Sequence, residues 1–230
     1  LFDGRQTDVP HSTGIYNAAY VDKLYRGIKR NLTIPFEFIC LVDKNYIFQE
    51  DIKAVRFKRS VDQYGWMSLM EMYRPDLCEG IRLTVGLDTI ITGNIDDICS
   101  FNKPMGMISD TMDAGRVCNG ITIANKETCD YIWKIWTTRR EWVYNTFTMY
   151  DQSPGDGVPS EMLLLRDLFD QGGHCPRLDL IYPNKIFSYK MQIEDSPGLL
   201  TNASIVYFHG DPKPNQLTKS HYIGLLEHWI

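Results

Sequence analysis

Residues 81–97, IRLTVGLDTIITGNIDD, decide the fold that we predict for this chain. They begin with a short apolar strand that ends at Asp88, and a second apolar run, residues 89–92, follows at once. In an open α/β sheet, ligands collect just beyond the carboxyl ends of the strands. An aspartate that a buried strand delivers there is well placed to hold a metal ion, although aspartate is equally a common turn residue.

Helices and strands alternate on both sides of this stretch in the first half of the chain. Apolar residues at helical spacing predict a helix over 16–31 and another around 66–73. Apolar runs predict a buried strand over 36–42, ending at Asp43, and a shorter strand over 53–57. This alternation predicts an α/β fold in which a mixed, mainly parallel sheet is flanked by helices.

The second half of the chain has a more mixed character. Apolar runs predict further strands, over 105–109, 117–124, 177–182, 186–190 and 204–208. Helical spacing predicts two longer helices, over 126–147 and 159–169. No linker, internal repeat or low-complexity tract interrupts the pattern, so we predict one domain. The chain opens on Leu1-Phe2, which we expect to be the tail of a first strand that begins outside this sequence.

Composition narrows the class of protein. The chain has 230 residues, of which 43% are hydrophobic and 23% charged, and its net charge is −5. A chain of this length can bury about 70% of the surface that its unfolded form exposes. The acidic balance predicts no nucleic acid partner, and the lack of any apolar run of about 18 residues predicts no transmembrane segment. Six cysteines without close pairing, and no signal peptide, suggest reduced thiols and a cytoplasmic location.

Two segments far apart in the sequence carry complementary chemistry. The first holds Asp88, with Asp96 or Asp97 nearby, and the second holds His209 and Lys213. Carboxylate oxygen and imidazole nitrogen suit a divalent transition metal such as manganese, while lysine supplies a point charge for a phosphate.

The loop after residue 208 strengthens this interpretation. A histidine that ends a strand is more often a surface or packed residue than a ligand. Gly210, however, permits close approach of the backbone to a ligand, and the prolines at 212 and 214 stiffen the loop that presents Lys213.

These residues resemble a known family. LTVGLDTIITGNIDD is similar to the strand and D-x-D segment of glycosyltransferases with the GT-A fold, and FHGDPKP is similar to the His and Lys motif that closes the site in glycogenin-like and galactosyltransferase-like members. Further segments occur in the same order as in small bacterial and phage-type glycosyltransferases: YVDKLYRGIKRNLTIPFEFICLVD, GWMSLMEMYRPD, VCNGITIA, GDGVPSEM and Ser188-Tyr189-Lys190. The resemblance covers most of the chain, and the order and number of the matches make it specific.

The resemblance implies a single GT-A-like domain over residues 1–230. Residues 1–97 would form the nucleotide-binding half, and 98–230 the acceptor half with a site-closing C-terminal segment. The implied activity transfers a hexosyl group from a nucleoside diphosphate sugar, most simply a UDP-sugar, to a hydroxyl acceptor, which could be a saccharide, a lipid or a protein. A divalent metal, Mn²⁺ or Mg²⁺, would bridge the diphosphate.

Several positions match functional positions of the family. Asp88 corresponds to the last acidic residue of D-x-D and His209 to a further metal ligand. The implied donor contacts are Tyr16 on the base, Asp43 near the base or ribose, Lys190, Gly210, and Lys213 along the diphosphate. Asn119 corresponds to a turn that faces the donor sugar. Asp156 and Glu161 fall on the acceptor side, and Asp156 is the first choice as the catalytic base of an inverting reaction, although a retaining reaction stays equally open.

Three positions depart from the family pattern. Gly86 stands where the first aspartate of D-x-D is usual, Leu69 where a basic residue is common, and Gly157 where a glutamine is usual. These departures favour an alternative function, a catalytically inactive GT-A scaffold that binds a nucleotide or a sugar or serves as an interaction module. A nucleotidyltransferase is a third alternative, which ranks low because no Gly-rich phosphate loop follows the first strand.

Overall fold

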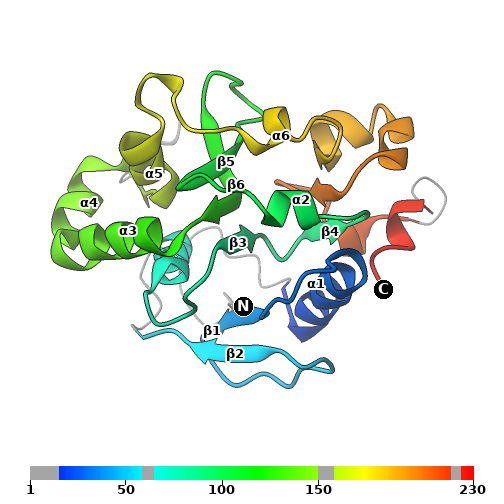
Figure 1. The fold of residues 1–230 in the computed structure, drawn as a ribbon, viewed down its shortest axis with the longest axis horizontal. Coiled ribbons are helices and arrows are strands. Elements are labelled where there is room, and N and C mark those ends of the chain that lie inside the picture. The colour runs from blue at the N-terminus through cyan, green and yellow to red at the C-terminus, as the bar shows by residue number, and fades with distance from the viewer. Residues whose placement is uncertain (1–15, 59–64, 150–157, 219–223) are drawn as a thin grey trace.

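The computed structural model describes residues 16–58, 65–149, 158–218 and 224–230 (Figure 1). The longer helices are α1 (Ala18–Asn31), the 3₁₀ helix η2 (Gly65–Tyr73), α3 (Lys126–Thr138), α4 (Arg140–Thr146) and α5 (Glu161–Phe169). The shorter helical turns are α2 (Asp96–Cys99), η3 (Gln171–Gly173), α6 (Leu178–Ile181), η4 (Tyr189–Ile193), η5 (Pro197–Thr201) and η6 (Pro214–Gln216). The strands are β1 (Ile39–Val42), β2 (Lys53–Arg56), β3 (Arg82–Val85), β4 (Thr89–Ile91), β5 (Met105–Ser109), β6 (Val117–Ala124), β7 (Thr148–Met149), β8 (Val158–Pro159), β9 (Ile186–Ser188) and β10 (Ile205–Tyr207).

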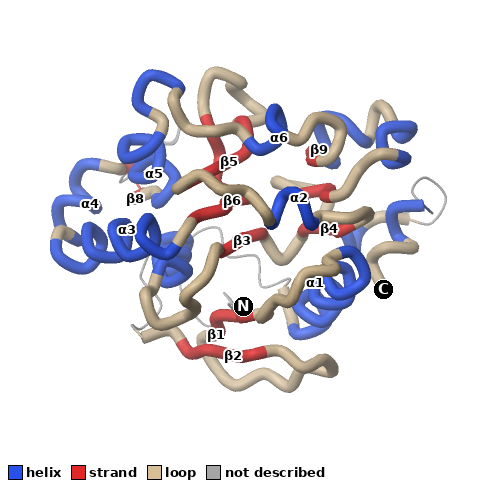
Figure 2. Tube along the Cα trace, viewed as in Figure 1, coloured by secondary structure: helices blue, strands red, loops and turns tan. Residues whose placement is uncertain are grey.

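Two three-stranded sheets form the centre of the molecule, with strand orders β3-β6-β5 and β4-β10-β9 (Figure 2). The pairs β3–β6, β5–β6 and β4–β10 are antiparallel, whereas β9–β10 and the separate pair β1–β2 are parallel. The mixed α/β fold that the sequence predicts is therefore confirmed. The expectation of a mainly parallel sheet is corrected, because antiparallel pairs predominate among the described strands. Antiparallel neighbours such as β5 and β6 need only a short loop, whereas parallel neighbours need a crossover.

Helix α1 shows how local sequence and packing agree. The side chain of Asn17 caps its first turn by accepting a hydrogen bond from the Ala19 N–H (3.0 Å). Leu24 and Ile28 lie on the buried face, in one apolar cluster with Ile91 of β4. The helix approaches this strand closely, because a Cβ atom added at Gly27 would lie 3.4 Å from Ile91 Cβ.

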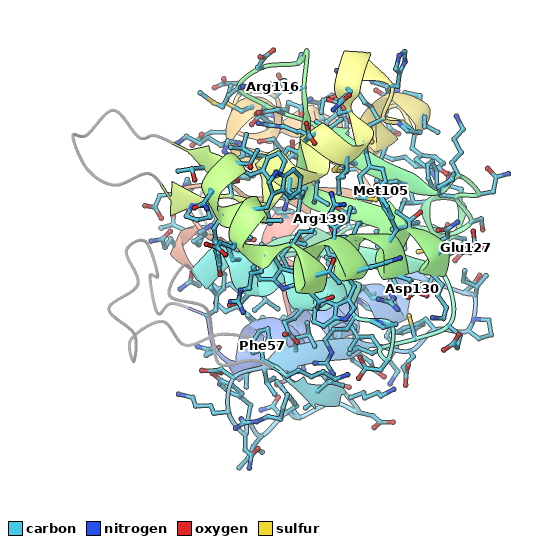
Figure 3. The ribbon with its side chains drawn as sticks, turned by 90° about the vertical axis from the view of Figure 1, so that its left-hand side faces the viewer. Phe57, Met105, Arg116, Glu127, Asp130 and Arg139 are labelled. Atoms are coloured by element: carbon cyan, nitrogen blue, oxygen red, sulfur yellow. The ribbon has the colours of Figure 1, made fainter. Side chains whose placement is uncertain are left out.

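A second apolar cluster fills the end of the molecule formed by α3, α4 and α5. Ile132 and Trp136 of α3 pack there with Met67 and Met70 of η2. Figure 3 faces this end and shows α3 lying across it, with Glu127 in its first turn. No helix within the described ranges combines the length and the apolar character needed to span a bilayer.

Gly106 in β5 occupies a position where the core leaves no room for a side chain. An added Cβ atom would lie 2.8 Å from both Leu178 Cδ2 and Phe101 Cζ. We expect Gly106→Ala to lower the free energy of unfolding by about 1–3 kcal/mol, because overpacking forces neighbours to move. Urea denaturation measures this loss in the free energy of unfolding. Gly80→Ala is the matched control, since nothing lies within 4 Å of its added Cβ, and equal effects at the two glycines would contradict the prediction.

Most predicted elements are confirmed with small shifts at their ends, and three are corrected. The predicted helix over 126–147 is two helices, α3 and α4, because the backbone of Arg139 leaves the helical conformation (φ −131°, ψ 32°). The helix around 66–73 is the tighter 3₁₀ type. The predicted strand over 177–182 is wrong. After one bridge from Arg177 to Met107 the chain enters α6, and the Asp179 carboxylate accepts the Ser109 N–H (2.8 Å) in place of a strand partner.

Candidate functional site

Asp88 lies in the turn that joins the two central sheets. The turn connects β3 of one sheet to β4 of the other, and the Thr89 N–H closes it on the Gly86 carbonyl oxygen (3.2 Å). The Asp88 side chain is buried, with 7% of the residue exposed. It folds back over Gly86, where an added Cβ atom would lie 2.8 Å from Asp88 Oδ1.

Strand register brings distant segments to the same edge as Asp88. Tyr207 of β10 lies opposite Thr89 of β4 in the antiparallel pair and opposite Ser188 of β9 in the parallel pair. The residues that follow β9 and β10 therefore leave the sheet beside the Asp88 turn. These residues include Lys190 and His209, which the sequence analysis proposed as site residues.

Lys213 and Tyr16 both bind the Asp88 carboxylate. The Lys213 ammonium donates to Asp88 Oδ2 (2.5 Å), and the Tyr16 hydroxyl donates to the same oxygen (2.8 Å). Lys213 is itself 9% exposed, and its Nζ lies 5.8 Å from the centre of the Tyr16 ring. Burial raises the pKa of Tyr16, and the negative charge of Asp88 raises it further. Tyr16 thus holds the carboxylate through its hydroxyl, and its contact with a base stays a prediction.

His209 follows β10 and bonds to the end of β9. Its Nε2 atom lies 2.9 Å from the Oγ of Ser188, a fully buried hydroxyl that also accepts the Met191 N–H (3.2 Å). Burial lowers the pKa of His209, and the positive charges of Lys190 and Lys213 lower it further. The imidazole is therefore favoured in its neutral form.

Gly210 and Lys190 complete this edge of the site. Gly210 has a left-handed backbone (φ +63°), which glycine adopts without strain. The exposed Lys190 side chain places its ammonium 3.8 Å from the position that a Cβ atom at Gly210 would occupy. A lysine ammonium and the glycine backbone thus lie next to each other, an arrangement that suits a phosphate.

Four other carboxylates proposed from the sequence have partners of their own or lie outside the described residues. The Asp43 carboxylate accepts the Tyr46 hydroxyl (2.9 Å) at the end of β1. Asp97 pairs with Lys185 (2.6 Å), and Asp96 accepts the Thr33 backbone N–H (2.7 Å), so neither aspartate joins Asp88. Asp156 lies outside the described residues.

Asn119 and Glu161 form a second polar group. The Asn119 amide on β6 donates to Glu161 Oε1 (3.0 Å) at the start of α5. Glu161 is buried, and burial raises its pKa to about 7, although the hydrogen bond from Asn119 lowers it in part. This carboxyl group can hold or release a proton near neutral pH. That Asn119 faces a donor sugar stays a prediction.

Asp110 is a charged neighbour that sequence reasoning missed. It follows β5, pairs with Arg166 (2.6 Å), lies 3.6 Å from Arg116 (labelled in Figure 3), and its negative charge acts on His209. The available signal was the same as for Asp88, an aspartate directly after an apolar strand.

The described side chains do not fit a divalent metal ion. Nowhere in the described ranges do three or more His, Cys, Asp or Glu residues gather in a way that could hold one. Asp88 is already bound by an ammonium group, Nε2 of His209 is engaged by Ser188, and Gly86 supplies no second carboxylate. Thr89 Oγ1, a buried hydroxyl oxygen beside the turn, has no hydrogen-bond partner among the described residues.

Comparison with known proteins identifies the fold. No family model and no curated protein matches the sequence. The galactosyltransferase LgtC, solved with donor and acceptor sugar analogs, is similar in structure with a TM-score of 0.57 and 13% identity, over 90% of this chain and 88% of LgtC. GlyE of Streptococcus pneumoniae TIGR4 matches with a TM-score of 0.57 and 13% identity, over 92% of this chain.

The bifunctional glycosyltransferase WbbM is similar at a TM-score of 0.56 and 9% identity, over 92% of this chain. The chain spans 58% of the length of GlyE and 47% of the length of WbbM. At such identities the likeness shows the fold alone, and that fold is the GT-A glycosyltransferase fold that the resemblance in sequence implied.

Proposed function

We propose that this chain is a glycosyltransferase that moves a sugar from a nucleoside diphosphate sugar, most simply a UDP-sugar, to a hydroxyl acceptor. The observation that carries the proposal is the convergence of Lys213, Lys190 and Gly210 beside Asp88, at the edge where the two central sheets meet. Two ammonium groups and an open stretch of backbone suit a diphosphate. In a GT-A fold, this edge is where a nucleotide-sugar donor is expected.

The residues of the site would act by electrostatic stabilisation. Negative charge grows on the diphosphate as the sugar departs, and preorganised positive groups lower the energy of that state. Asp88 and Tyr16 hold Lys213 in one position, so that no reorganisation is needed during the reaction. Lys190, which is exposed, would add a second positive charge.

The acceptor side of the proposal rests on carboxyl groups. Asp156 remains the proposed base if the reaction inverts the anomeric centre. The Asn119–Glu161 pair would then orient the sugar or the acceptor, because an amide fixed by a buried carboxyl group has a defined direction.

A catalytically inactive scaffold is the second candidate function. It is favoured by Gly86, which leaves a single carboxylate in the place of D-x-D, and by the closed pair between Asp88 and Lys213. Such a protein would bind a nucleotide or a sugar without releasing product.

Release of nucleoside diphosphate from a panel of UDP-, GDP- and ADP-sugars tests the proposal. We expect slow hydrolysis of one donor, with and without Mn²⁺ in the buffer, and a rate about 10²–10³-fold lower for Lys213→Met. Lys126→Met is the matched control, because it removes a partly exposed lysine that pairs with Asp130 on α3, away from Asp88. Binding of a nucleotide without turnover supports the inactive scaffold. If no donor binds and none is hydrolysed, both candidate functions are overturned.

A further inference from the structure

We infer that the donor site works without a divalent metal ion and that the ammonium group of Lys213 stands in the place of that ion. The inference rests on the proposed function, since it concerns how the same site meets a diphosphate. It departs from the Mn²⁺ or Mg²⁺ that the resemblance in sequence implied.

The Asp88 carboxylate lacks the excess negative charge that would hold a dication. A divalent ion is held where carboxylates leave a net negative charge. Here one carboxylate faces one ammonium at 2.5 Å, so the pair carries no net charge. The side chains of both residues are largely buried, with 11% of Lys213 and 10% of Asp88 exposed, and water screens such a pair weakly. A dication that approaches Asp88 Oδ2 would have to displace this ammonium.

Position 86 has no room for the side chain of a second carboxylate while Asp88 keeps its present position. A site with two carboxylates needs a side chain here, but an added Cβ atom would lie 2.8 Å from Asp88 Oδ1. The Asp88 carboxylate thus occupies the volume that a residue at position 86 would use. Gly86 thus leaves room for Asp88 Oδ1, while Oδ2 accepts from Lys213 and Tyr16.

The surroundings of His209 also disfavour a dication. Its Nε2 atom bonds to Ser188, and the positive charges of Lys190 and Lys213 act on the imidazole together with the negative charges of Asp110 and Asp88. Because Lys213 is paired with Asp88, the exposed Lys190 is the ammonium that repels a dication here and attracts a diphosphate. The same cluster that is poor for a metal is therefore good for phosphate oxygens.

Isothermal titration of the full chain tests the inference. The probes are Mn²⁺ alone, and UDP, GDP and ADP in buffer with EDTA or with Mn²⁺. We expect no saturable binding of Mn²⁺ alone, and one nucleoside diphosphate that binds with equal affinity in both buffers. Lys213→Met should weaken that affinity about 10- to 100-fold, because a charged hydrogen bond is lost, whereas Lys213→Arg should keep most of it and Lys126→Met all of it.

The outcomes separate this inference from the proposed function. Saturable Mn²⁺ binding to the chain alone, or nucleotide binding that EDTA abolishes, overturns the metal-free site and leaves the glycosyltransferase standing. If no nucleotide binds in either buffer, both the metal-free site and the proposed glycosyltransferase function are overturned. The Mn²⁺ titration uses the unsubstituted chain, so the result does not depend on whether Lys213→Met folds.

Discussion

Lys213→Met is expected to lower the free energy of unfolding by about 3–5 kcal/mol, because it leaves the Asp88 carboxylate buried without its ammonium partner. Both side chains are about one-tenth exposed, and Tyr16 would remain the one described donor to Asp88 Oδ2. Urea denaturation at neutral pH measures the loss. The control Lys126→Met should cost at most about 1 kcal/mol, since its partner Asp130 lies at the surface.

A double-mutant cycle shows whether the loss comes from the pair itself. Asp88→Asn keeps an acceptor for Tyr16 while it removes the negative charge. The double variant Asp88→Asn with Lys213→Met should therefore be more stable than the sum of the single effects predicts, by at least about 1 kcal/mol. Additive effects, or a loss for Lys213→Met no larger than for Lys126→Met, would show that the two side chains are not coupled.

Glu161→Gln is expected to stabilise the protein at pH 8 by about 3 kcal/mol and to change its stability little near pH 4. The pKa of Glu161 is raised from 4.5 to about 7 by burial. As pH rises from 4.5 to 7, the unfolded chain releases this proton while the folded chain keeps it, so stability falls through this window. Above pH 7 the loss is complete. Glutamine has no proton to release, and its amide oxygen can still accept the Asn119 amide.

Urea denaturation of both proteins between pH 4 and 8 measures this difference. Subtracting the two curves removes the contributions of all groups that titrate alike in both. Among the described residues, Tyr73 from η2 and Cys118 from β6 interact electrostatically with Glu161, and both have raised pKa values, so they stay neutral throughout the window. A difference that does not change with pH would mean that Glu161 ionises in the folded protein as it does in the unfolded chain.

Sequence alone predicted the elements whose residues repeat with a clear period. Helix α1, with its apolar face, and strands β5 and β6 lie where the pattern placed them, although α1 begins two residues later than predicted, after its cap at Asn17. The GT-A fold also followed from the order of the motifs. These features are local, since a helix or a strand depends mainly on which residues within one or two turns share a face.

The site was predictable only as a set of candidate residues. Asp88, His209, Lys190 and Lys213 were all named from the sequence, and the structure brings them to one edge. Asp96 and Asp97 were equally plausible aspartates, but they bind Thr33 and Lys185, and the donor contact of Asp43 stays a prediction. Nothing in the sequence distinguishes a strand-end aspartate that faces the site from one that faces another loop.

Tertiary structure alone decided what these residues do to one another. Lys213 and Asp88 are 125 residues apart, and only the register of β4 against β10 brings the ammonium onto the carboxylate. Tertiary packing also places the Asp88 carboxylate against Gly86. It buries Glu161, and this burial raises the pKa of that residue. The sequence by itself determined most of the elements, the mixed α/β fold class and the candidate residues, because these depend on local periodicity and motif order. Charge pairing, burial and rotamer choice depend on long-range packing, and so only the folded chain decided them.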